Sequence, residues 1–306
     1  MVVTKSDLVD SGLLLIDKPA GPSSAQVVHR VKVLLRARKV GHLGTLDPFA
    51  SGLLLLGINE GTKVADIFLS AAKSYRGIMV LGVDTDSQDA TGTIVQVRRV
   101  PAIGKIELRD LEQQFSGDLR QVPPMFSALK KEGVPLYRLA RQGKEVPREP
   151  RSIRVEKLRL HKLGNDEIEI ELTCSRGTYV RTLAADMGKF LGCGAHLKSL
   201  RRIACGHLTV DQAVTLDDLE RRDPRMTVPL LSLEKALGHL RAVTWENQLL
   251  SRLRLGQQET LRHLDKPVGG EKLARILDPR GGLVALVEWI EDVPQGRWRL
   301  IRIFKL

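Results

Sequence analysis

One carboxylate in the chain, that of Asp47, is placed where it could do covalent chemistry. Residues 41–48 (GHLGTLDP) present this acid in a loop bounded by glycine and proline, shortly before the apolar run at 53–57. A carboxylate can attack a carbon atom of a sugar or a base and leave a covalent intermediate. Glycosidases that hydrolyse their substrates use two carboxylates. The motif supplies one, which favours a reaction without net hydrolysis.

The same residue has a simpler explanation, because an aspartate before proline often caps a turn. A partner for the carboxylate would favour the chemical role. Arg181, in the segment 175–182 (SRGTYVRT) at an expected helix start, could supply it. A bidentate arginine pair would hold Asp47 ionised, lower its pKa and fix its orientation. The alternative for Arg181 is an ordinary surface arginine on a helix.

Two of the three tyrosines stand beside basic residues at the ends of expected elements. Tyr75 lies between Lys73 and Arg76 at the head of a strand, and Tyr179 precedes a helix. Both could be stacking platforms for an unpaired base. The alternative is packing at the edge of the core. His42 could stack on RNA or insert into it, or it could simply be solvated.

The elements that must position these residues follow a mixed pattern. An apolar strand at 12–16 leads into the turn 17–22, where Ser23 or Ser24 can cap a helix. Strict βαβ alternation and phosphate-loop or dinucleotide motifs are absent from the sequence, so a doubly wound nucleotide fold is not expected. We predict an α+β fold with strands at 53–58, 74–83, 153–160, 167–174 and 196–208, helices at 60–69, 105–115 and 178–191, and a polar turn at 84–87.

Two further segments differ from this core. Residues 121–151 mix prolines with lysines and arginines, which predicts a basic and partly mobile excursion. After Val243 the pattern changes to short strands at 274–277, 282–289 and 297–304, with a hairpin turn at 278–282. We therefore predict a catalytic domain at 1–242, with an insertion at about 123–151, and a small β domain at 243–306.

The charge of the chain favours an acidic partner. It has 48 lysines and arginines against 36 aspartates and glutamates, a formal net charge of +12. Nucleic acid is the most common partner of such a protein, although a basic protein without one is the alternative. We find no apolar run of the ~18–20 residues that cross a bilayer and no secretory signal at 1–11. The cytoplasm is the expected location, with no membrane partner.

The cysteines are not arranged for a disulfide framework or a metal site. There are three, Cys174, Cys193 and Cys205, without a CxxC pair. Their spacing to histidines does not make a zinc site. We expect small, buried, reduced side chains and no metal.

Long motifs in order along the chain resemble the bacterial tRNA pseudouridine synthase B family nearly end to end. Matches this long and in this order are highly specific. They are the Asp-Lys-Pro turn at 17–19, GHLGTLDPFASGLL at 41–54, KSY at 73–75, SALKKEGVPLYRLARQGKEVPRE at 127–149, SRGTYVRTL at 175–183 and LGCGAHLKSLRR at 191–202.

The resemblance implies a pseudouridine synthase fold, with a mixed and mostly antiparallel sheet split by a central cleft. In it, Asp47 matches the catalytic aspartate, Tyr75 the aromatic residue that contacts the target base, and Arg181 the arginine paired with the aspartate. The segment 243–306 resembles a short PUA-like domain. The resemblance further implies nucleotide or cleft-wall positions for His42, Tyr179 and Leu200, and contacts to the RNA backbone from Lys18, Lys130, Lys131 and Arg141.

The implied reaction converts uridine 55 in the T loop of tRNA to pseudouridine. The base must be flipped out at a cost of a few kcal/mol, which phosphate contacts can offset. Asp47 attacks either C1′ of the ribose or C6 of the uracil, and Tyr75 or a water is a candidate acceptor of the C5 proton. The isomerisation is redox-neutral, so no cofactor is expected. We also expect a monomer with no protein partner.

Three alternatives stay open. The protein could be a tRNA-binding or tRNA-folding module in which catalysis is secondary. It could be a guide-directed RNA pseudouridine synthase with protein partners, although the chain has no long basic tail. It could also be a hydrolytic nucleosidase, which the single carboxylate of the motif disfavours.

Overall fold

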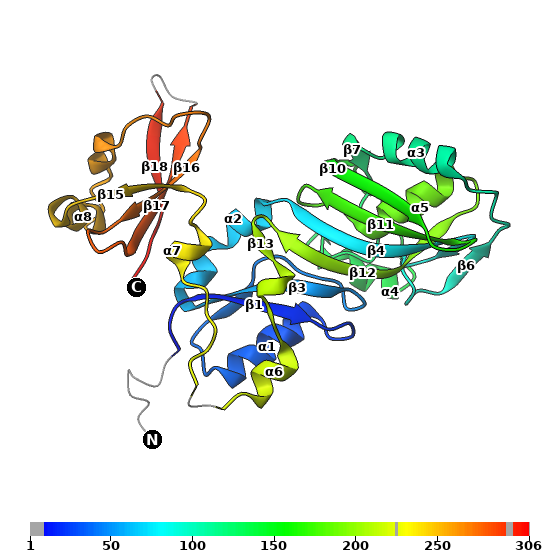
Figure 1. Ribbon diagram of the computed structural model, residues 1–306, viewed down its shortest axis with the longest axis horizontal. Coiled ribbons are helices and arrows are strands. Elements are labelled where there is room, and N and C mark those ends of the chain that lie inside the picture. The colour runs from blue at the N-terminus through cyan, green and yellow to red at the C-terminus, as the bar shows by residue number, and fades with distance from the viewer. Residues whose placement is uncertain (1–8, 224–225, 292–295, 306) are drawn as a thin grey trace.

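The computed structural model describes residues 9–223, 226–291 and 296–305, so what was predicted for residues 1–8 lies outside it. The described chain forms a large sheet and a smaller C-terminal one (Figure 1). The strands of the large sheet are β1 (Gly12–Lys18), β2 (Val40–His42), β3 (Ser51–Ile58), β4 (Lys73–Leu81), β7 (Gly117–Gln121), β10 (Arg151–Lys162), β11 (Glu167–Cys174), β12 (Ala195–Cys205), β13 (Leu208–Thr209) and β14 (Val214–Thr215).

The large sheet has the order β14-β1-β3-β12-β4-β11-β10-β7, with β2 paired to β3 and β13 paired to β12. Most pairs are antiparallel, and β1/β14 and β3/β12 are parallel. The mixed, mostly antiparallel sheet is thus confirmed. In its centre, β12 lies between β3, which follows the Asp47 loop, and β4, which carries Tyr75. The sheet therefore brings two distant motifs to the two strands that flank β12.

Helices cover the two halves of this sheet. Figure 1 shows α1 (Ser24–Leu34) and α6 (Leu216–Arg221) near β1, and α3 (Lys105–Gln114) and α5 (Val180–Phe190) near β10 and β11. Helix α1 begins after Ser23, whose side chain accepts a hydrogen bond from the Gln26 amide in a capping box. Its apolar side chains belong to the same buried core as those of α5 and the sheet.

The helix predicted at 60–69 is wrong in its first half. That half is a 3-10 helix, η2 (Asn59–Val64), and only α2 (Ala65–Ser70) is α-helical. The reason is close packing at Gly61, where a Cβ would come within 2.0 Å of the Gly12 carbonyl oxygen on β1. The first turn therefore lies directly against the sheet.

The strand predicted at 74–83 is also divided. Strand β4 ends at Leu81 because Gly82 has a φ of +85°. Residues Val83–Thr85 then form a separate strand, β5, which pairs with β6 (Ile94–Val97). The turn predicted at 84–87 accordingly starts after β5, and it brings Ser87 and Asp89 toward α5.

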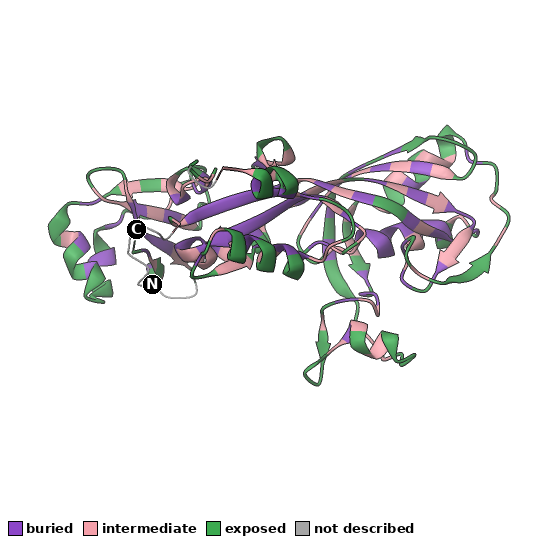
Figure 2. Cartoon of the chain, turned by 90° about the horizontal axis from the view of Figure 1, so that it is seen from below, coloured by how far each residue is buried: buried purple, intermediate pink, exposed green. Residues whose placement is uncertain are grey.

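The basic excursion contains regular structure. It holds a short hairpin of β8 (Lys130–Lys131) and β9 (Val134–Pro135), followed by the helix α4 (Leu136–Arg141). In Figure 2 this arm, drawn at the bottom of the view, projects away from the sheet and is mostly exposed. We call residues 123–151 the arm.

The C-terminal residues form a four-stranded sheet of order β15-β16-β17-β18. The strands predicted at 274–277, 282–289 and 297–304 are confirmed with small shifts, and β15 was not predicted. The 3-10 helix η3 (Val210–Gln212) lies between β13 and β14 of the large sheet. The C-terminal part and its connection contain α7 (Leu233–Ala236), β15 (Arg241–Thr244), α8 (Asn247–Arg254), η4 (Gln258–His263), β16 (Leu273–Leu277), β17 (Leu283–Ile290) and β18 (Arg297–Ile303).

The C-terminal sheet is fixed to the rest of the protein at η2. Lys63 Nζ donates to the Ile303 carbonyl at 2.9 Å, and Glu60 accepts from the Lys305 amide at 2.9 Å. Phe304 is buried among apolar side chains of β1, β3 and α2. These contacts tie the last strand to the same region of the chain that follows β3.

The three cysteines are buried, as predicted, and none of them is paired with another. Among the described residues, no helix is long and apolar enough to cross a bilayer, and no three His, Cys, Asp or Glu side chains are grouped to hold a metal ion.

Candidate active site

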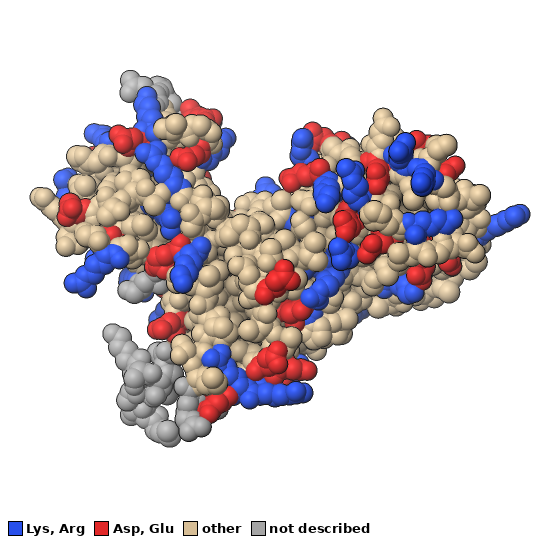
Figure 3. All heavy atoms as spheres, viewed as in Figure 1, with Lys and Arg blue, Asp and Glu red and all other residues tan. Residues whose placement is uncertain are grey.

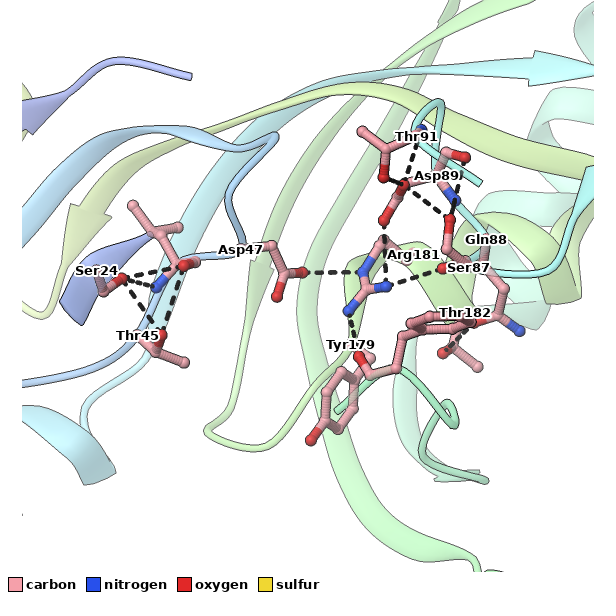
Figure 4. Close-up of polar contacts among 12 residues, drawn as sticks. Ser24, Thr45, Asp47, Ser87, Gln88, Asp89, Thr91, Tyr179, Arg181 and Thr182 are labelled. Atoms are coloured by element: carbon pink, nitrogen blue, oxygen red, sulfur yellow. Dashed lines mark hydrogen bonds and ion pairs between the residues drawn. The ribbon is translucent and has the colours of Figure 1, made fainter. Parts of the chain in front are cut away.

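The loop that carries Asp47 is fixed to the start of α1. Ser24 Oγ accepts a hydrogen bond from the Leu46 amide at 2.8 Å and donates to the Leu46 carbonyl at 3.0 Å (Figure 4). The Ala50 amide donates to the Asp47 carbonyl at 3.1 Å and closes a turn. The turn that sequence reasoning offered as an alternative thus exists, but it uses the backbone of Asp47 and leaves the carboxylate free to reach α5.

Lys18 stabilises this loop from the buried side, and the prediction that it contacts the RNA backbone is wrong. The side chain is fully buried, and its ammonium donates to the carbonyls of Pro19, Pro22 and Pro48 at 2.7, 2.9 and 3.3 Å. Burial lowers the pKa of Lys18 to about 8, and the nearby Asp47 charge opposes this shift. Lys18 therefore stabilises two proline turns and has no exposed donor for a phosphate.

The side chain of Arg181 is the centre of the site. Its Nε forms an ion pair with Asp47 Oδ2 at 2.9 Å, and its Nη1 donates to Asp89 Oδ2 at 3.2 Å (Figure 4). Nη1 also donates to the Ser87 carbonyl at 2.8 Å, and Nη2 donates to the Phe126 carbonyl at 2.9 Å. The expected bidentate pair is not formed, because Nη1 is directed at Ser87 and Asp89 and Nη2 at Phe126, and only Nε faces Asp47.

The expected low pKa of Asp47 is also wrong in direction. Burial in the pocket raises the pKa of the Asp47 carboxyl; the Arg181 charge opposes the shift, and the Asp89 charge adds to it. The carboxylate is nevertheless accessible, since 38% of its side-chain surface is exposed while that of Arg181 is 5% exposed. One buried guanidinium thus orients an accessible acid.

Sequence reasoning missed Asp89. Its Oδ1 accepts hydrogen bonds from Ser87 Oγ at 2.8 Å and from Thr91 Oγ1 at 2.6 Å, while Oδ2 faces Arg181. The side chain is buried. The only signal in the sequence was a polar turn, which gave no reason to distinguish this acid from Asp86.

Five of the six residues predicted to be catalytic or substrate-binding line one pocket with a volume of about 220 Å³. A cavity of this size is small for a drug-sized ligand and suits a single base. Asp47 is the one carboxylate among the lining residues that the structure describes. His42 is exposed on β2 and does not line it. The lining residues are Gly44, Thr45, Leu46, Asp47, Leu69, Lys73, Tyr75, Ser175, Arg176, Gly177, Thr178, Tyr179, Val180, Arg181, Leu200 and Arg202.

Burial affects the hydroxyl of Tyr75, whereas hydrogen bonds fix the backbone of Tyr179. Burial raises the pKa of Tyr75 to about 12, and the nearby Arg202 guanidinium opposes the shift. Tyr75 is therefore a neutral phenol at pH 7. The backbone of Tyr179 is bound by the buried Gln121 amide, with N–H···O distances of 2.8 Å from the Tyr179 amide and 3.1 Å to its carbonyl. Gln121 ends β7, where the arm begins, so the arm base and the start of α5 are joined.

The cations predicted to bind RNA on the arm are accessible. Lys130, Lys131 and Arg141 are exposed, and none of them forms an ion pair within the described part of the chain. Elsewhere the charges are mixed. On the face in Figure 3, acidic and basic side chains alternate over β4, β10 and β11, with Arg76–Glu171 and Arg154–Asp118 paired at 2.7 and 2.8 Å. The arm thus offers unpaired positive charge that this face of the sheet does not.

Solved structures share the whole architecture. Over 96% of its length the chain superposes on 85% of a chain in the crystal structure of a Cbf5–Nop10–Gar1 complex, with a TM-score of 0.71 and 25% identity. A chain in a structure of an H/ACA RNP bound to a substrate RNA containing 2′-deoxyuridine gives a TM-score of 0.69 at 22% identity, again covering 96% of this chain and 85% of that one.

The sequence comparisons agree. Residues 32–180 match the N-terminal domain of the TruB family pseudouridylate synthases, and residues 181–237 match the C-terminal domain of tRNA pseudouridylate synthase B. The chain is 42% identical to tRNA pseudouridine synthase B of Geobacter sulfurreducens over 96% of its own length and 99% of that protein. It is 40% identical to the same enzyme of Syntrophobacter fumaroxidans over 97% of its own length and 98% of that protein.

Fold and sequence together define a pseudouridine synthase, an isomerase. Within this class, the chain belongs to the TruB family.

Proposed function

We propose that the protein converts uridine to pseudouridine in tRNA, at position 55 of the T loop. The observation that carries the proposal is the contact between Arg181 and the accessible carboxylate of Asp47, in a pocket the size of one base. The relatives named tRNA pseudouridine synthase B support tRNA as the substrate. The exposed cations of the arm support binding to a polyanion.

Base flipping fits the shape of the site. Asp47 lies in a recessed pocket whose walls include Tyr75, Tyr179 and Leu200. A uridine stacked inside a folded loop cannot reach such a carboxylate, so it must be extruded at a cost of a few kcal/mol. Contacts from the arm to phosphates can offset that cost, and the tyrosine rings can stack on the extruded base.

The single carboxylate fits an isomerisation. Asp47 attacks C1′ of the ribose or C6 of the uracil, and the bond between N1 and C1′ breaks. The base turns, a bond forms between C5 and C1′, and Asp47 is released. The proton on C5 is lost and N1 gains one, so atoms and charge balance without water or a redox partner. Asp89 is no second acid for hydrolysis, because it lies buried behind Arg181.

The state of Tyr75 restricts its part in the last step. Its pKa of about 12 keeps the hydroxyl protonated at neutral pH. The hydroxyl can accept the C5 proton only if it passes its own proton on in the same step. Otherwise a water molecule takes the proton, and Tyr75 contributes by stacking on the base.

The remaining expectations are part of the same proposal. Residues 1–242 would be the catalytic domain, with the arm as its RNA-gripping insertion, and residues 243–306 a PUA-like domain. The four-stranded sheet begins at Arg241, close to that boundary. The enzyme would act in the cytoplasm as a monomer, without a protein partner or a guide RNA.

The test is product analysis of unmodified tRNA incubated with the purified full-length protein alone. Wild type should form pseudouridine at position 55, and a tRNA with cytidine there should give none. Asp47→Ala should bind tRNA and form no product. Pseudouridine that appears at another position would reject the T-loop site, and product from Asp47→Ala at the wild-type rate would reject the catalytic role. Base release with water uptake would instead identify a nucleosidase.

A further inference from the structure

We propose that Arg202 is a positioning residue for the isomerisation: its guanidinium fixes the Asp47 loop relative to the strand that carries Tyr75. The inference rests on the proposed function and concerns a residue for which sequence reasoning gave no role. Three observations carry it, namely the register of β12, the hydrogen bonds of the side chain, and the absence of a counter-ion.

The register of the sheet places Arg202 between the two halves of the site. Arg202 is the direct partner of Tyr75 on β4 and of Gly52 on β3. Strand β3 begins four residues after Asp47. Arg202 therefore lies between the strand that follows the Asp47 loop and the strand that carries Tyr75. A Cβ at Gly52 would lie 2.3 Å from the Arg202 carbonyl oxygen. The close approach of β3 to β12 therefore needs glycine at that position.

The guanidinium of Arg202 binds the backbone on both sides of Asp47. Nη2 donates to the Gly44 carbonyl at 3.0 Å and Nη1 donates to the Thr45 carbonyl at 3.1 Å. Nε donates to the Leu53 carbonyl at 2.7 Å. The first two acceptors precede Asp47 and the third follows it. One planar group thus spans the base of the loop, a geometry that a lysine ammonium cannot reproduce.

The same side chain reaches the pocket. Arg202 is one of the lining residues although it is only 3% exposed, and its charge acts on the Tyr75 hydroxyl. No carboxylate within the described residues forms an ion pair with it. A buried cation without a counter-ion is costly, and here three backbone carbonyls and the Tyr75 hydroxyl are its neighbours. Burial of the Arg202 cation is therefore explained by the fixed geometry that it gives the reacting groups and not by a gain in stability.

Positioning should matter because Asp47 must reach one carbon of a base held against Tyr75. A displacement of about 1 Å can cost roughly 100-fold in rate. Ser24 and Lys18 hold the loop at Leu46 and Pro48. Arg202 is the contact that relates the loop to β12, and through it to β4.

The test compares Arg202→Gln and Arg202→Lys with Arg201→Gln in the full-length protein. Arg201 is the neighbour on β12, and its side chain is engaged with Asp17 at 2.8 and 2.7 Å. Single-turnover rates with unmodified tRNA, dissociation constants for tRNA and thermal unfolding midpoints are measured for each. Arg202→Gln should lose about 100-fold in rate and Arg202→Lys at least 10-fold, with tRNA affinity within about threefold. Arg201→Gln should keep the wild-type rate.

Chemical rescue separates positioning from a purely structural role. Guanidinium at millimolar concentration should raise the rate of Arg202→Gln at least threefold, leave wild type unchanged and leave the unfolding midpoint of the variant unchanged. If Arg202→Gln does not fold, Arg202→Lys decides alone by its rate at native affinity. A wild-type rate in either folded variant, or a loss of rate that follows a loss of affinity or of folded protein, would overturn the proposal. If wild type forms no pseudouridine, the proposed function fails instead.

Discussion

Arg181 contacts Asp47 through a single N–H group, Nε, at 2.9 Å. Nη1 is directed at Asp89 and Ser87, and Nη2 donates to the Phe126 carbonyl. These acceptors come from the turn after β5 and from the first part of the arm. The guanidinium is therefore fixed by the protein before substrate arrives, and Asp47 is the one acceptor of the four that is accessible from the pocket.

Replacing Arg181 with lysine should reduce turnover far more than binding. A lysine keeps the positive charge but loses the planar fork that serves Asp47 and three other acceptors at once. We expect the single-turnover rate of Arg181→Lys to fall by about 100-fold. The tRNA dissociation constant, measured by filter binding, should change by less than about threefold. An unchanged rate would show that the Arg181–Asp47 contact is dispensable for the reaction.

The acidic limb of the pH–rate profile should move when Asp89 is neutralised. Asp47 must be ionised to attack, so the rate falls as the pH drops through its pKa. The negative charge of Asp89 helps to raise that pKa. Asp89→Asn removes the charge, so the pKa of Asp47 should fall and the acidic limb should shift to lower pH. The readout is the pH dependence of the single-turnover rate.

The control for this shift is Asp86→Asn, an exposed acid in the same turn. It should leave the profile in place, because Asp86 does not contact Arg181. A shift of the acidic limb to higher pH in Asp89→Asn would contradict the electrostatic argument. An identical shift in both variants would assign the effect to the turn as a whole.

Neutralising the arm should weaken tRNA binding and its dependence on salt. The triple variant Lys130→Gln, Lys131→Gln, Arg141→Gln removes three exposed cations. Each lost phosphate contact lowers the slope of log K against log salt by about 0.7 to 0.9, so the slope should fall by roughly 2 to 3. Titrations at several salt concentrations measure this change.

As a control, a matched triple variant replaces Lys105, Arg109 and Lys189 with glutamine. These three cations are exposed on α3 and α5, away from the arm. It should keep the wild-type slope. If both triple variants lose the same slope, the effect is one of net charge and not of the arm. If neither does, the arm does not contact phosphates.

The sequence predicted the main elements because their signals are local. Alternation predicted β10 and β11, a cap at Ser23 or Ser24 predicted α1, where Ser23 is the cap, and the Asp-Pro-Arg-Gly-Gly turn predicted the C-terminal hairpin. The start of η2 was wrong because it depends on the approach of Gly61 to Gly12, 49 residues away in sequence, which no local pattern records.

The site was predicted less completely, for a related reason. Asp47, Tyr75 and Arg181 lie in long motifs, but Asp89 and Arg202 contact partners far away in sequence, on α5 and in the Asp47 loop. Lys18 shows the opposite error. A lysine in a proline turn suggests an exposed cation, yet three backbone carbonyls converge on it and keep it buried. Side-chain partners of this kind are decided by tertiary structure.

The packing of β3 against β12 should make Gly52 the least replaceable glycine near the site. Its φ is +96°, and a Cβ would meet the Arg202 carbonyl oxygen at 2.3 Å. Gly192 has a similar φ of +77° with no atom within 4 Å of its Cβ position, so Gly192→Ala measures the backbone strain alone. We expect Gly192→Ala to lower the free energy of unfolding by about 1 to 2 kcal/mol and Gly52→Ala by about 3 kcal/mol or more. Chemical denaturation of both variants checks this, and equal losses would mean that β3 can move away from β12 at little cost.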